Sequence, residues 1–438
     1  MTRLMLEPFS SALVVESPHH TLDAILRDGG IQVHRNDGVS NEDELIQAIQ
    51  ETNAQIIFKR SRLPVTRRVV EACPSLYAVQ LCCIGDDSVD KAACADSGVL
   101  VFNDPISNGR SVVELTISHI IALSRRLYET DGQMHQHVWE KNAVGRYEIL
   151  GKVLGIVGLG NIGRQVARVA EALGMEVRFF DARFVAREVG IEMGWTCCET
   201  IEDLFAGSDV VSIHTSAKDP AGDSNAGFLD PYLSKLGTAR SKESPRIFIN
   251  LARGNLHQCD ALIDAVQKGF IRRAAVDVYP EEPARTGVPW TNPYANEPRI
   301  ICTPHIGAAT QEAQPRIAQR VAQTVLSFSK FGALRDCVYA PRVKMNLMDQ
   351  ARGHTLLAVV HSVSRGTKKA IDDAIFEAHA SNLGSMHRDF DVGVAYDLSV
   401  IDRSFSKEEL QQLSRRAADI SNDPQAIRAI RQLDIGEV

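Results

Sequence analysis

The sequence predicts an α/β protein with two Rossmann-like domains of parallel sheet and a smaller C-terminal domain of βαββαβ order. Over most of the chain, short apolar segments alternate with helical ones, which is typical of parallel sheets covered by helices. A glycine-rich turn at residues 158–163 lies between a strand and a helix and indicates a nucleotide-binding unit. After Tyr339 the pattern changes to longer alternating strands with two helices between them.

Length and composition exclude several classes of protein. The 438 residues correspond to about three domains. A net charge of -7 with scattered basic pairs disfavours nucleic-acid binding. No apolar run approaches a membrane span, and the N-terminus has no secretory pattern. The 9 cysteines include no C-x-x-C, so we expect a reduced cytoplasmic protein without a bound metal.

Residues 1–107 are predicted to form the first part of a substrate-binding domain. Helical stretches, one of them capped by Asn41, separate four short apolar segments. Strands are expected at residues 11–16, 55–58, 76–81 and 99–102. A long helix should follow, from Ser111 to about Glu129.

Residues 108–307 are predicted to form a nucleotide-binding domain inserted into the first. Its strands are expected at residues 153–157, 177–180, 210–214, 246–251, 274–278 and 299–303. The polar segment 216–245 is expected to carry an insertion. The first domain should then resume over residues 308–340.

A linker at residues 341–349 and a separate domain at residues 350–438 are expected to complete the chain. Ser406 and Glu409 form a capping box at the start of its second helix. The predicted order is a strand at 355–361, a helix at 367–380, strands near 383–390 and 392–400, a helix after Ser406 and a strand near 426–433.

The glycine-rich turn and the acid after the next strand predict a dinucleotide site. Positions without side chains let the backbone approach a pyrophosphate at a helix N-terminus. Asp181 ends the following strand, where a carboxylate can accept from both ribose hydroxyls. This favours NAD over NADP, although the nearby Arg183 leaves the second cofactor open. The residues expected at this turn are Gly158, Gly160, Asn161, Ile162 and Gly163.

Ionisable residues after three later strands are candidates for catalysis. Arg253 offers a fork of donors that matches a carboxylate. His305 follows an apolar strand and can move a proton at neutral pH. A neighbouring acid would stabilise the imidazolium, and both Glu281 and Glu282 are placed to do so. With the nucleotide turn, these residues suggest hydride transfer to or from a small hydroxy acid.

These motifs resemble those of the D-isomer-specific 2-hydroxyacid dehydrogenases, over residues from about 11 to 433. The chain is most similar to the group within that family that acts on phosphoglycerate and carries a C-terminal ACT domain. The resemblance implies that Arg253, Glu282 and His305 are catalytic, which selects Glu282 over Glu281. It also implies NAD contacts at Leu251, Ala252, Arg253, Asp277, His305, Gly307 and Ala308.

The resemblance further implies a phosphorylated substrate. Residues 59–62 are similar to the phosphate-binding segment of that group, and Arg60 and Arg62 can neutralise a dianion. The expected reaction is oxidation of 3-phospho-D-glycerate to 3-phosphohydroxypyruvate, which opens serine synthesis. Alternatives are another acid such as 2-hydroxyglutarate, or a nucleotide-sensing binding protein. The expected substrate residues are Arg60, Ser61, Arg62, Ile84, Gly85, Asn108, Arg253 and His305.

The C-terminal domain departs from the pattern of the group. Its loop reads Arg-Gly-Thr at residues 365–367, where Arg-Pro-Gly is usual. Asn382 matches an asparagine that contacts a serine effector across a dimer, but Ser364 replaces a second asparagine. Feedback by serine through Ser364 and Asn382 is therefore left open, beside a different amino-acid effector or none. The resemblance also implies a homodimer or homotetramer.

Overall fold

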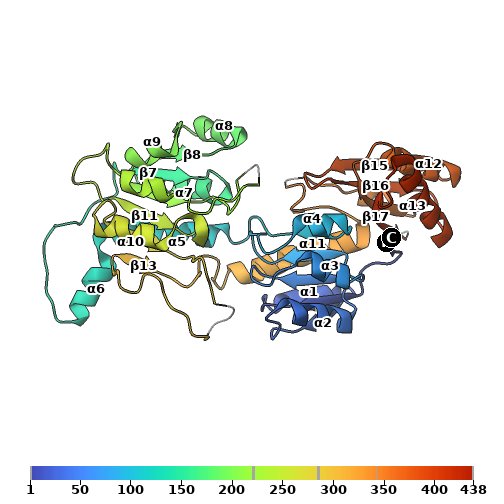
Figure 1. Cartoon of the computed structure of the whole chain (residues 1–438), viewed down its shortest axis with the longest axis horizontal. Helices are drawn as coiled ribbons and strands as arrows, with labels where there is room; N and C mark the ends of the chain where they lie inside the picture. The colour runs from blue at the N-terminus through green and yellow to red at the C-terminus, as the bar shows by residue number, and fades with distance from the viewer. Residues whose placement is uncertain (1, 220–221, 284–286, 342, 437–438) are drawn as a thin grey trace. The chain divides into compact units, whose positions relative to one another are not determined.

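A computed structural model of the chain has the predicted α/β class (Figure 1). Two sheets are wholly parallel, and a third sheet of mixed direction holds the C-terminal strands. None of the described helices combines the length and apolar character that crossing a membrane requires. The structure describes residues 2–219, 222–283, 287–341 and 343–436.

The chain divides into two compact units, one of which is formed by Asn108–Ala313. The other combines Met1–Ser107 with Gln314–Val438, so the first parallel sheet and the C-terminal sheet belong to one unit. Of the parts expected at residues 308–340 and 350–438, all but residues 308–313 therefore share a unit with residues 1–107.

The unit formed by Asn108–Ala313, called the nucleotide unit below, contains a seven-stranded parallel sheet. The strand order is β13-β12-β11-β10-β7-β8-β9. The direction of strand progression reverses beside β7, and ligands of such sheets bind at the carboxyl ends of the strands near that point. The strands are β7 (Val153–Val157), β8 (Glu176–Phe180), β9 (Thr196–Cys197), β10 (Val210–Ile213), β11 (Ile247–Asn250), β12 (Arg273–Val276) and β13 (Ile300–Cys302).

The helix expected from Ser111 to Glu129 is two helices, so that prediction was wrong. Arg126 takes a left-handed backbone with φ of 58°, which ends the first helix and starts the second. The segment 216–245 packs on the core through Leu229, Leu233 and Leu236, and residues 220–221 lie outside the described part. The helices are α5 (Gly109–Arg125), α6 (Leu127–His135), α7 (Asn161–Ala172), α8 (Phe184–Glu192), α9 (Ile201–Ala206), α10 (Cys259–Gln267) and the 3-10 helices η1 (Asp230–Lys235) and η2 (Gly254–Leu256).

The second parallel sheet has five strands in the order β3-β2-β4-β5-β6. Four of these strands were predicted within two residues, whereas the polar edge strand β3 was not. The strands are β2 (Ser11–Val14), β3 (Gln32–Arg35), β4 (Ile56–Lys59), β5 (Ala78–Leu81) and β6 (Leu100–Phe102). The helices are α1 (Thr21–Asp28), α2 (Glu42–Thr52), α3 (Arg67–Ala72), α4 (Lys91–Asp96) and α11 (Ala313–Phe331).

The C-terminal sheet confirms the predicted βαββαβ order and adds a strand from the N-terminus. Its order is β1-β17-β14-β16-β15, and β1 runs parallel to β17 with Arg3 opposite Ala429. The strands are β1 (Arg3–Met5), β14 (Thr355–Ser362), β15 (Asn382–Asp389), β16 (Val394–Ile401) and β17 (Ile427–Asp434), and the helices are α12 (Thr367–Glu377), α13 (Lys407–Ser421) and the 3-10 helix η3 (Met348–Gln350).

The C-terminal sheet is packed against α11 of the same unit. The buried guanidinium of Arg431 donates to the carbonyl oxygens of Phe328 and Ser329, at 2.8 and 2.6 Å. The expected linker 341–349 is also packed, because Met345 and Leu347 are buried in the core shared by both sheets. Arg342, within that linker, lies outside the described residues. The linker segment is therefore part of the core.

Candidate active site

The glycine turn between β7 and α7 has the backbone that a pyrophosphate site needs. Gly158 has φ of 93°, and a Cβ there would lie 2.6 Å from the carbonyl oxygen of His214. A Cβ at Gly163 would lie 2.3 Å from the carbonyl oxygen of Gly158. At Gly160 the nearest atom would be 3.9 Å away, so this position faces open space. The turn thus leaves room for a phosphate at the N-terminus of α7.

Asp181 lies directly after β8, with its carboxylate beside the glycine turn. Its Oδ2 accepts from the main-chain N–H of Leu159 at 2.8 Å and from Arg183 Nη2 at 2.7 Å. Burial by itself would raise the pKa of Asp181, but the hydrogen bonds from Arg183 outweigh it and lower the pKa. The group is therefore an ionised acceptor, and Arg183 donates to both of its oxygens.

A side-chain amide fixes the turn that carries Arg253. Asn250, the last residue of β11, donates from Nδ2 to the carbonyl oxygen of Arg253 at 2.8 Å and accepts from the N–H of Ala252 at 3.0 Å. A Cβ at Gly254 would lie 2.0 Å from the carbonyl carbon of Tyr279, so only glycine fits there. Sequence reasoning missed Asn250, although a polar residue ending an apolar strand was a usable signal.

His305 and Glu282 form a hydrogen-bonded pair. Nδ1 of His305 lies 2.8 Å from Oε2 of Glu282, whose Oε1 accepts from the N–H of Tyr279 at 3.2 Å. The hydrogen bond with Glu282 raises the pKa of His305, against the opposing effect of burial. Burial would raise the pKa of Glu282, but its hydrogen bond with His305 helps to lower it. Glu282, rather than Glu281, contacts the histidine.

The loop that presents His305 is held by the buried carboxylate of Asp277. Oδ1 of Asp277 accepts from Oγ1 of Thr303 at 2.6 Å and from the N–H of Ile306 at 2.8 Å, and Oδ2 accepts from the N–H of Gly307 at 2.8 Å. His305 itself has φ of 53°, in the left-handed region. Burial raises the pKa of Asp277, whose exposure is 1%. These contacts indicate a positioning role for Asp277.

The predicted phosphate segment in the other unit is held by Glu16, which the sequence did not reveal. The buried carboxylate of Glu16 accepts from the main-chain N–H groups of Arg60 at 2.8 Å, Arg62 at 2.9 Å and Leu63 at 3.2 Å. The Lys59 ammonium donates to the carbonyl oxygen of Arg60 at 2.8 Å. The buried side chains of Glu16 and Lys59 therefore hold the backbone that carries both arginines. Ser61 and the side chain of Arg62 are exposed.

The remaining predicted substrate residues lie in both units. Ile84 and Gly85 follow β5, and Asn103 Nδ2 donates to the carbonyl oxygen of Ile84 at 2.7 Å. Asn108 is buried at the start of α5, and its Oδ1 has no hydrogen-bond partner within the described part of the chain. Asn108 therefore belongs to the same unit as Arg253 and His305, whereas Ile84 and Gly85 belong to the unit of Arg60.

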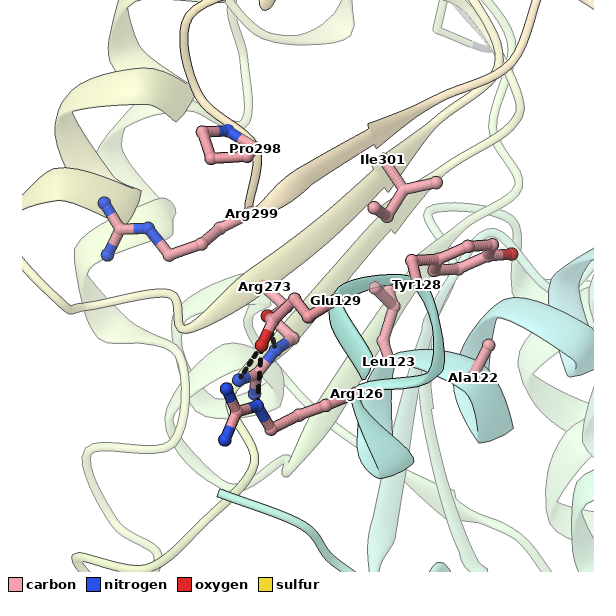
Figure 2. Close-up of a pocket in the computed structure, with 9 residues that line it drawn as sticks. All are labelled: Ala122, Leu123, Arg126, Tyr128, Glu129, Arg273, Pro298, Arg299 and Ile301. Atoms are coloured by element: carbon pink, nitrogen blue, oxygen red, sulfur yellow. Dashed lines mark hydrogen bonds and ion pairs between the residues drawn. The ribbon is translucent and has the colours of Figure 1, made fainter. Parts of the chain in front are cut away.

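A pocket in the nucleotide unit lies at the opposite edge of the sheet from these loops. Arg273 and Arg299, which line it, stand at the amino ends of β12 and β13 (Figure 2). The glycine turn, Arg253 and His305 all follow the carboxyl ends of strands. The pocket is therefore separate from the candidate active site.

The predicted effector residues border α12 and β15. Ser364 precedes Gly366, whose φ is 98° and where a Cβ would lie 2.6 Å from Cγ2 of Ile420. Asn382 begins β15, is exposed, and accepts from the N–H of Gly384 through its Oδ1 at 3.2 Å. A glycine is therefore required at position 366, where the sequence departs from the usual loop.

Comparison with known proteins relates the chain to dehydrogenases. The family described as D-isomer specific 2-hydroxyacid dehydrogenase, NAD binding domain, matches residues 117–307. D-3-phosphoglycerate dehydrogenase 2 of Saccharomyces cerevisiae is 32% identical over 95% of this chain and 88% of its own length. D-3-phosphoglycerate dehydrogenase of Escherichia coli is 34% identical over 86% of this chain and 87% of its own.

A solved structure supports the fold. D-Lactate dehydrogenase of Aquifex aeolicus, complexed with NAD and lactic acid, aligns with a TM-score of 0.61 at 23% identity. The alignment covers 72% of this chain and 95% of that one. At this level of identity the likeness concerns the fold alone.

Proposed function

The chain belongs to the D-isomer-specific 2-hydroxyacid dehydrogenase family, and on this premise we propose that it oxidises 3-phospho-D-glycerate to 3-phosphohydroxypyruvate with NAD. The observation that carries the chemistry is the 2.8 Å contact between His305 and Glu282, in the unit that holds the glycine turn. Two relatives that match most of the chain are named for phosphoglycerate. The reaction would open L-serine synthesis.

In the proposed mechanism, His305 is the general base. Its Nδ1 is engaged by Glu282, so Nε2 takes the proton of the substrate hydroxyl. Glu282 stabilises the imidazolium that forms. Arg253 binds the substrate carboxylate through its fork of donors. Bound NAD supplies the carbon that accepts the hydride.

The NAD site is proposed along the carboxyl edge of the nucleotide sheet. The pyrophosphate would lie on the glycine turn, and Asp181 would accept from the ribose hydroxyls in place of Arg183. Asp277 acts mainly by fixing the loop of His305. The proposed contact residues are Gly158, Gly160, Asn161, Ile162, Gly163, Asp181, Leu251, Ala252, Arg253, His305, Gly307 and Ala308.

Arg60 and Arg62 are proposed to bind the substrate phosphate. Glu16 accepts from the main-chain N–H groups of both residues, which fixes the direction of the segment. Guanidinium groups bind phosphate in a charge-assisted, bidentate geometry. Ser61, Ile84, Gly85 and Asn108 complete the proposed substrate contacts.

A substrate panel with NAD and NADP tests this function. We expect phosphoglycerate to be oxidised with NAD far faster than unphosphorylated glycerate or 2-hydroxyglutarate. Arg62→Ala should raise the KM for phosphoglycerate by roughly tenfold or more, since a charge-assisted contact is lost. Arg68→Ala is the matched control, because Arg68 is exposed on α3 and pairs with Asp43 at 2.5 Å. A preference for 2-hydroxyglutarate would contradict the proposal.

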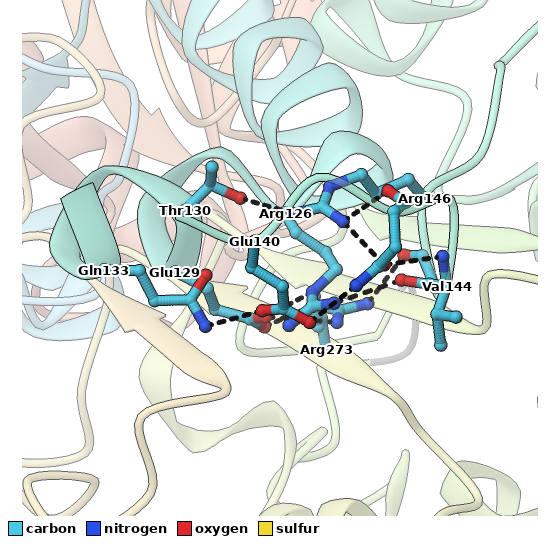
Figure 3. A network of polar contacts seen from close by, with 10 residues as sticks. Arg126, Glu129, Thr130, Gln133, Glu140, Val144, Arg146 and Arg273 are labelled. Atoms are coloured by element: carbon cyan, nitrogen blue, oxygen red, sulfur yellow. Dashed lines mark hydrogen bonds and ion pairs between the residues drawn. The ribbon is translucent and has the colours of Figure 1, made fainter. Parts of the chain in front are cut away.

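We also propose a homo-oligomer that uses residues 136–150 as part of its interface. A polar network holds this segment against the rest of the nucleotide unit (Figure 3). In that network Glu129 accepts hydrogen bonds from Arg126 and from Arg273, each at 2.6 Å. Arg126 also donates to the carbonyl oxygen of Val144 at 3.1 Å. The segment nevertheless exposes apolar side chains, including Trp139 at 78%. Fixed, exposed apolar groups are typical of an interaction surface.

Light scattering on the full chain and on Trp139→Glu tests the interface, and an unchanged mass in the variant would contradict it. We further propose a cytoplasmic location, because the nine cysteines, which all lie within the described residues, form no disulfide. We also propose that an amino-acid effector binds at Ser364 and Asn382. This site should bind L-serine more weakly than a site with two asparagines would. Rates measured with and without L-serine test that proposal.

A further inference from the structure

Three strands of the C-terminal sheet place two histidines and an aspartate on one face. His387 on β15 lies directly opposite Asp397 on β16, and His361 on β14 is two residues from Val359, the other cross-strand partner of Asp397. Side chains two residues apart on a strand share a face. Nε2 of His361 lies 2.8 Å from Oδ2 of Asp397, and Nδ1 of His387 lies 3.0 Å from Oδ1.

Each histidine also has an oxygen acceptor beside its other ring nitrogen. Nδ1 of His361 lies 2.7 Å from the carbonyl oxygen of Ser362, and Nε2 of His387 lies 3.1 Å from Oδ1 of Asp389. If these nitrogens carry the ring protons, the lone pairs of the two remaining nitrogens face Asp397. This is the arrangement of metal-binding histidines, which donate their second N–H to a carbonyl or carboxylate.

We propose that His361, His387 and Asp397 form a binding site for Zn²⁺. One ligand atom from each residue lies within 4.8 Å of the other two. A tetrahedral zinc site with bonds of about 2.0 Å places its ligand atoms about 3.3 Å apart, so small side-chain shifts would admit the ion. Two imidazoles and a carboxylate are a common zinc donor set. Because the His387 side chain is 38% exposed, water can reach the fourth position.

The charge of Asp397 supports this assignment. The Asp397 side chain is 1% exposed, and His361, His387 and Lys368 all lie within 3.5 Å of its oxygens. A buried carboxylate surrounded by such groups favours a nearby cation. Lys368 is the competing cation, at 3.5 Å from Oδ1 of Asp397, but it also pairs with Asp372 at 2.6 Å. Zinc would leave Lys368 with Asp372 alone.

The test is calorimetric titration of metal-free, full-length protein with Zn²⁺. We expect one high-affinity site per chain that His387→Gln weakens by roughly 100-fold or more. Asp389→Asn should weaken it by about 10- to 100-fold, because Asp389 orients a ligand. Lys368→Ala should strengthen binding, since it removes the competing charge. His135→Gln is the matched control, because His135 is an exposed histidine that pairs with Asp131 at 3.6 Å outside this sheet.

Cobalt provides a second readout that does not depend on affinity. Co²⁺ bound by the wild type should give the visible absorption of a tetrahedral site, and His387→Gln should lose it. Equal Zn²⁺ affinity in the wild type and in folded His387→Gln would overturn the proposal, as would the absence of binding by the wild type. If His387→Gln does not fold, Asp389→Asn and Lys368→Ala decide, and unchanged affinity in both would overturn it.

Discussion

Two histidine–carboxylate pairs in this molecule have the same contact distance and different surroundings. In each, a ring nitrogen and a carboxylate oxygen are 2.8 Å apart. The His305 and Glu282 side chains are 49% and 27% exposed, whereas those of His361 and Asp397 are 2% and 1% exposed. The first pair is open to a small molecule, as the proton transfer proposed for it requires, and the second pair is closed to molecules of that size. Access, rather than the contact itself, therefore separates the proposed catalytic pair from the proposed metal-binding one.

The backbone explains the difference in access. His305 stands on a loop after β13, in a left-handed conformation supported by Asp277. His361 and Asp397 stand within neighbouring strands, beneath α12. Loops at a sheet edge present side chains outward, whereas strand residues beneath a helix are enclosed.

The largest effect is expected from a substitution in the exposed pair of His305 and Glu282. His305→Ala removes the proposed base and should lower kcat by roughly 100-fold or more, with NAD binding retained. Because the side chain is half exposed, the free energy of unfolding should change by less than about 0.5 kcal/mol. Turnover and urea unfolding measure both quantities. Wild-type turnover in the variant would exclude His305 as the base.

The same substitution in the buried pair should change stability. His361→Ala in metal-free protein deprives the Asp397 carboxylate of a partner, at a cost of about 1–3 kcal/mol in the free energy of unfolding. Urea unfolding of His361→Ala beside His305→Ala makes the comparison direct. Equal stability of the two variants would mean that burial does not distinguish the pairs.

Neutralising the partner of His305 should shift a pH profile. Oxidation requires the neutral imidazole, so its rate rises as the pH passes upward through the pKa of His305, which Glu282 holds above its ordinary value. Glu282→Gln should move this rise to lower pH and lower kcat by about tenfold. The measurement is kcat/KM against pH, with Glu281→Gln as control. A profile unmoved by Glu282→Gln would contradict the pairing.

The smallest expected effect concerns a carboxylate paired with arginine instead of histidine. Asp181→Asn removes the charge that repels a 2'-phosphate, and should raise the KM for NAD by about fivefold while NADP becomes usable. Steady-state kinetics with both cofactors measure it. An unchanged preference would show that Arg183, rather than Asp181, decides the choice.

Features encoded by neighbouring residues were predictable from the sequence. The strand, glycine turn and helix from Val153 to Ala172 appear as expected, because each signal is local. The capping box of Ser406 and Glu409 is also present as predicted. Glu282 was selected over Glu281 only through a family resemblance, and the structure places it beside His305.

Features that depend on distant residues were not predictable. Glu16 supports the main chain of Arg60 and Arg62 across many residues, and no local pattern encodes that contact. β3 was missed because its polar residues at a sheet edge do not alternate with apolar ones. The break at Arg126 was missed because an arginine rarely adopts a left-handed backbone.

The pairing of β1 with β17 has a consequence for how the protein is made. Arg3 leaves the ribosome long before its partner Ala429, because the whole nucleotide unit lies between them in the chain. The rest of this unit is also incomplete at that stage, because α11 and the C-terminal strands follow the whole nucleotide unit in the chain. The nucleotide unit can fold during synthesis. Strand β1 has no partner strand until β17 has been made, so this unit can be completed only after the nucleotide unit has been synthesised.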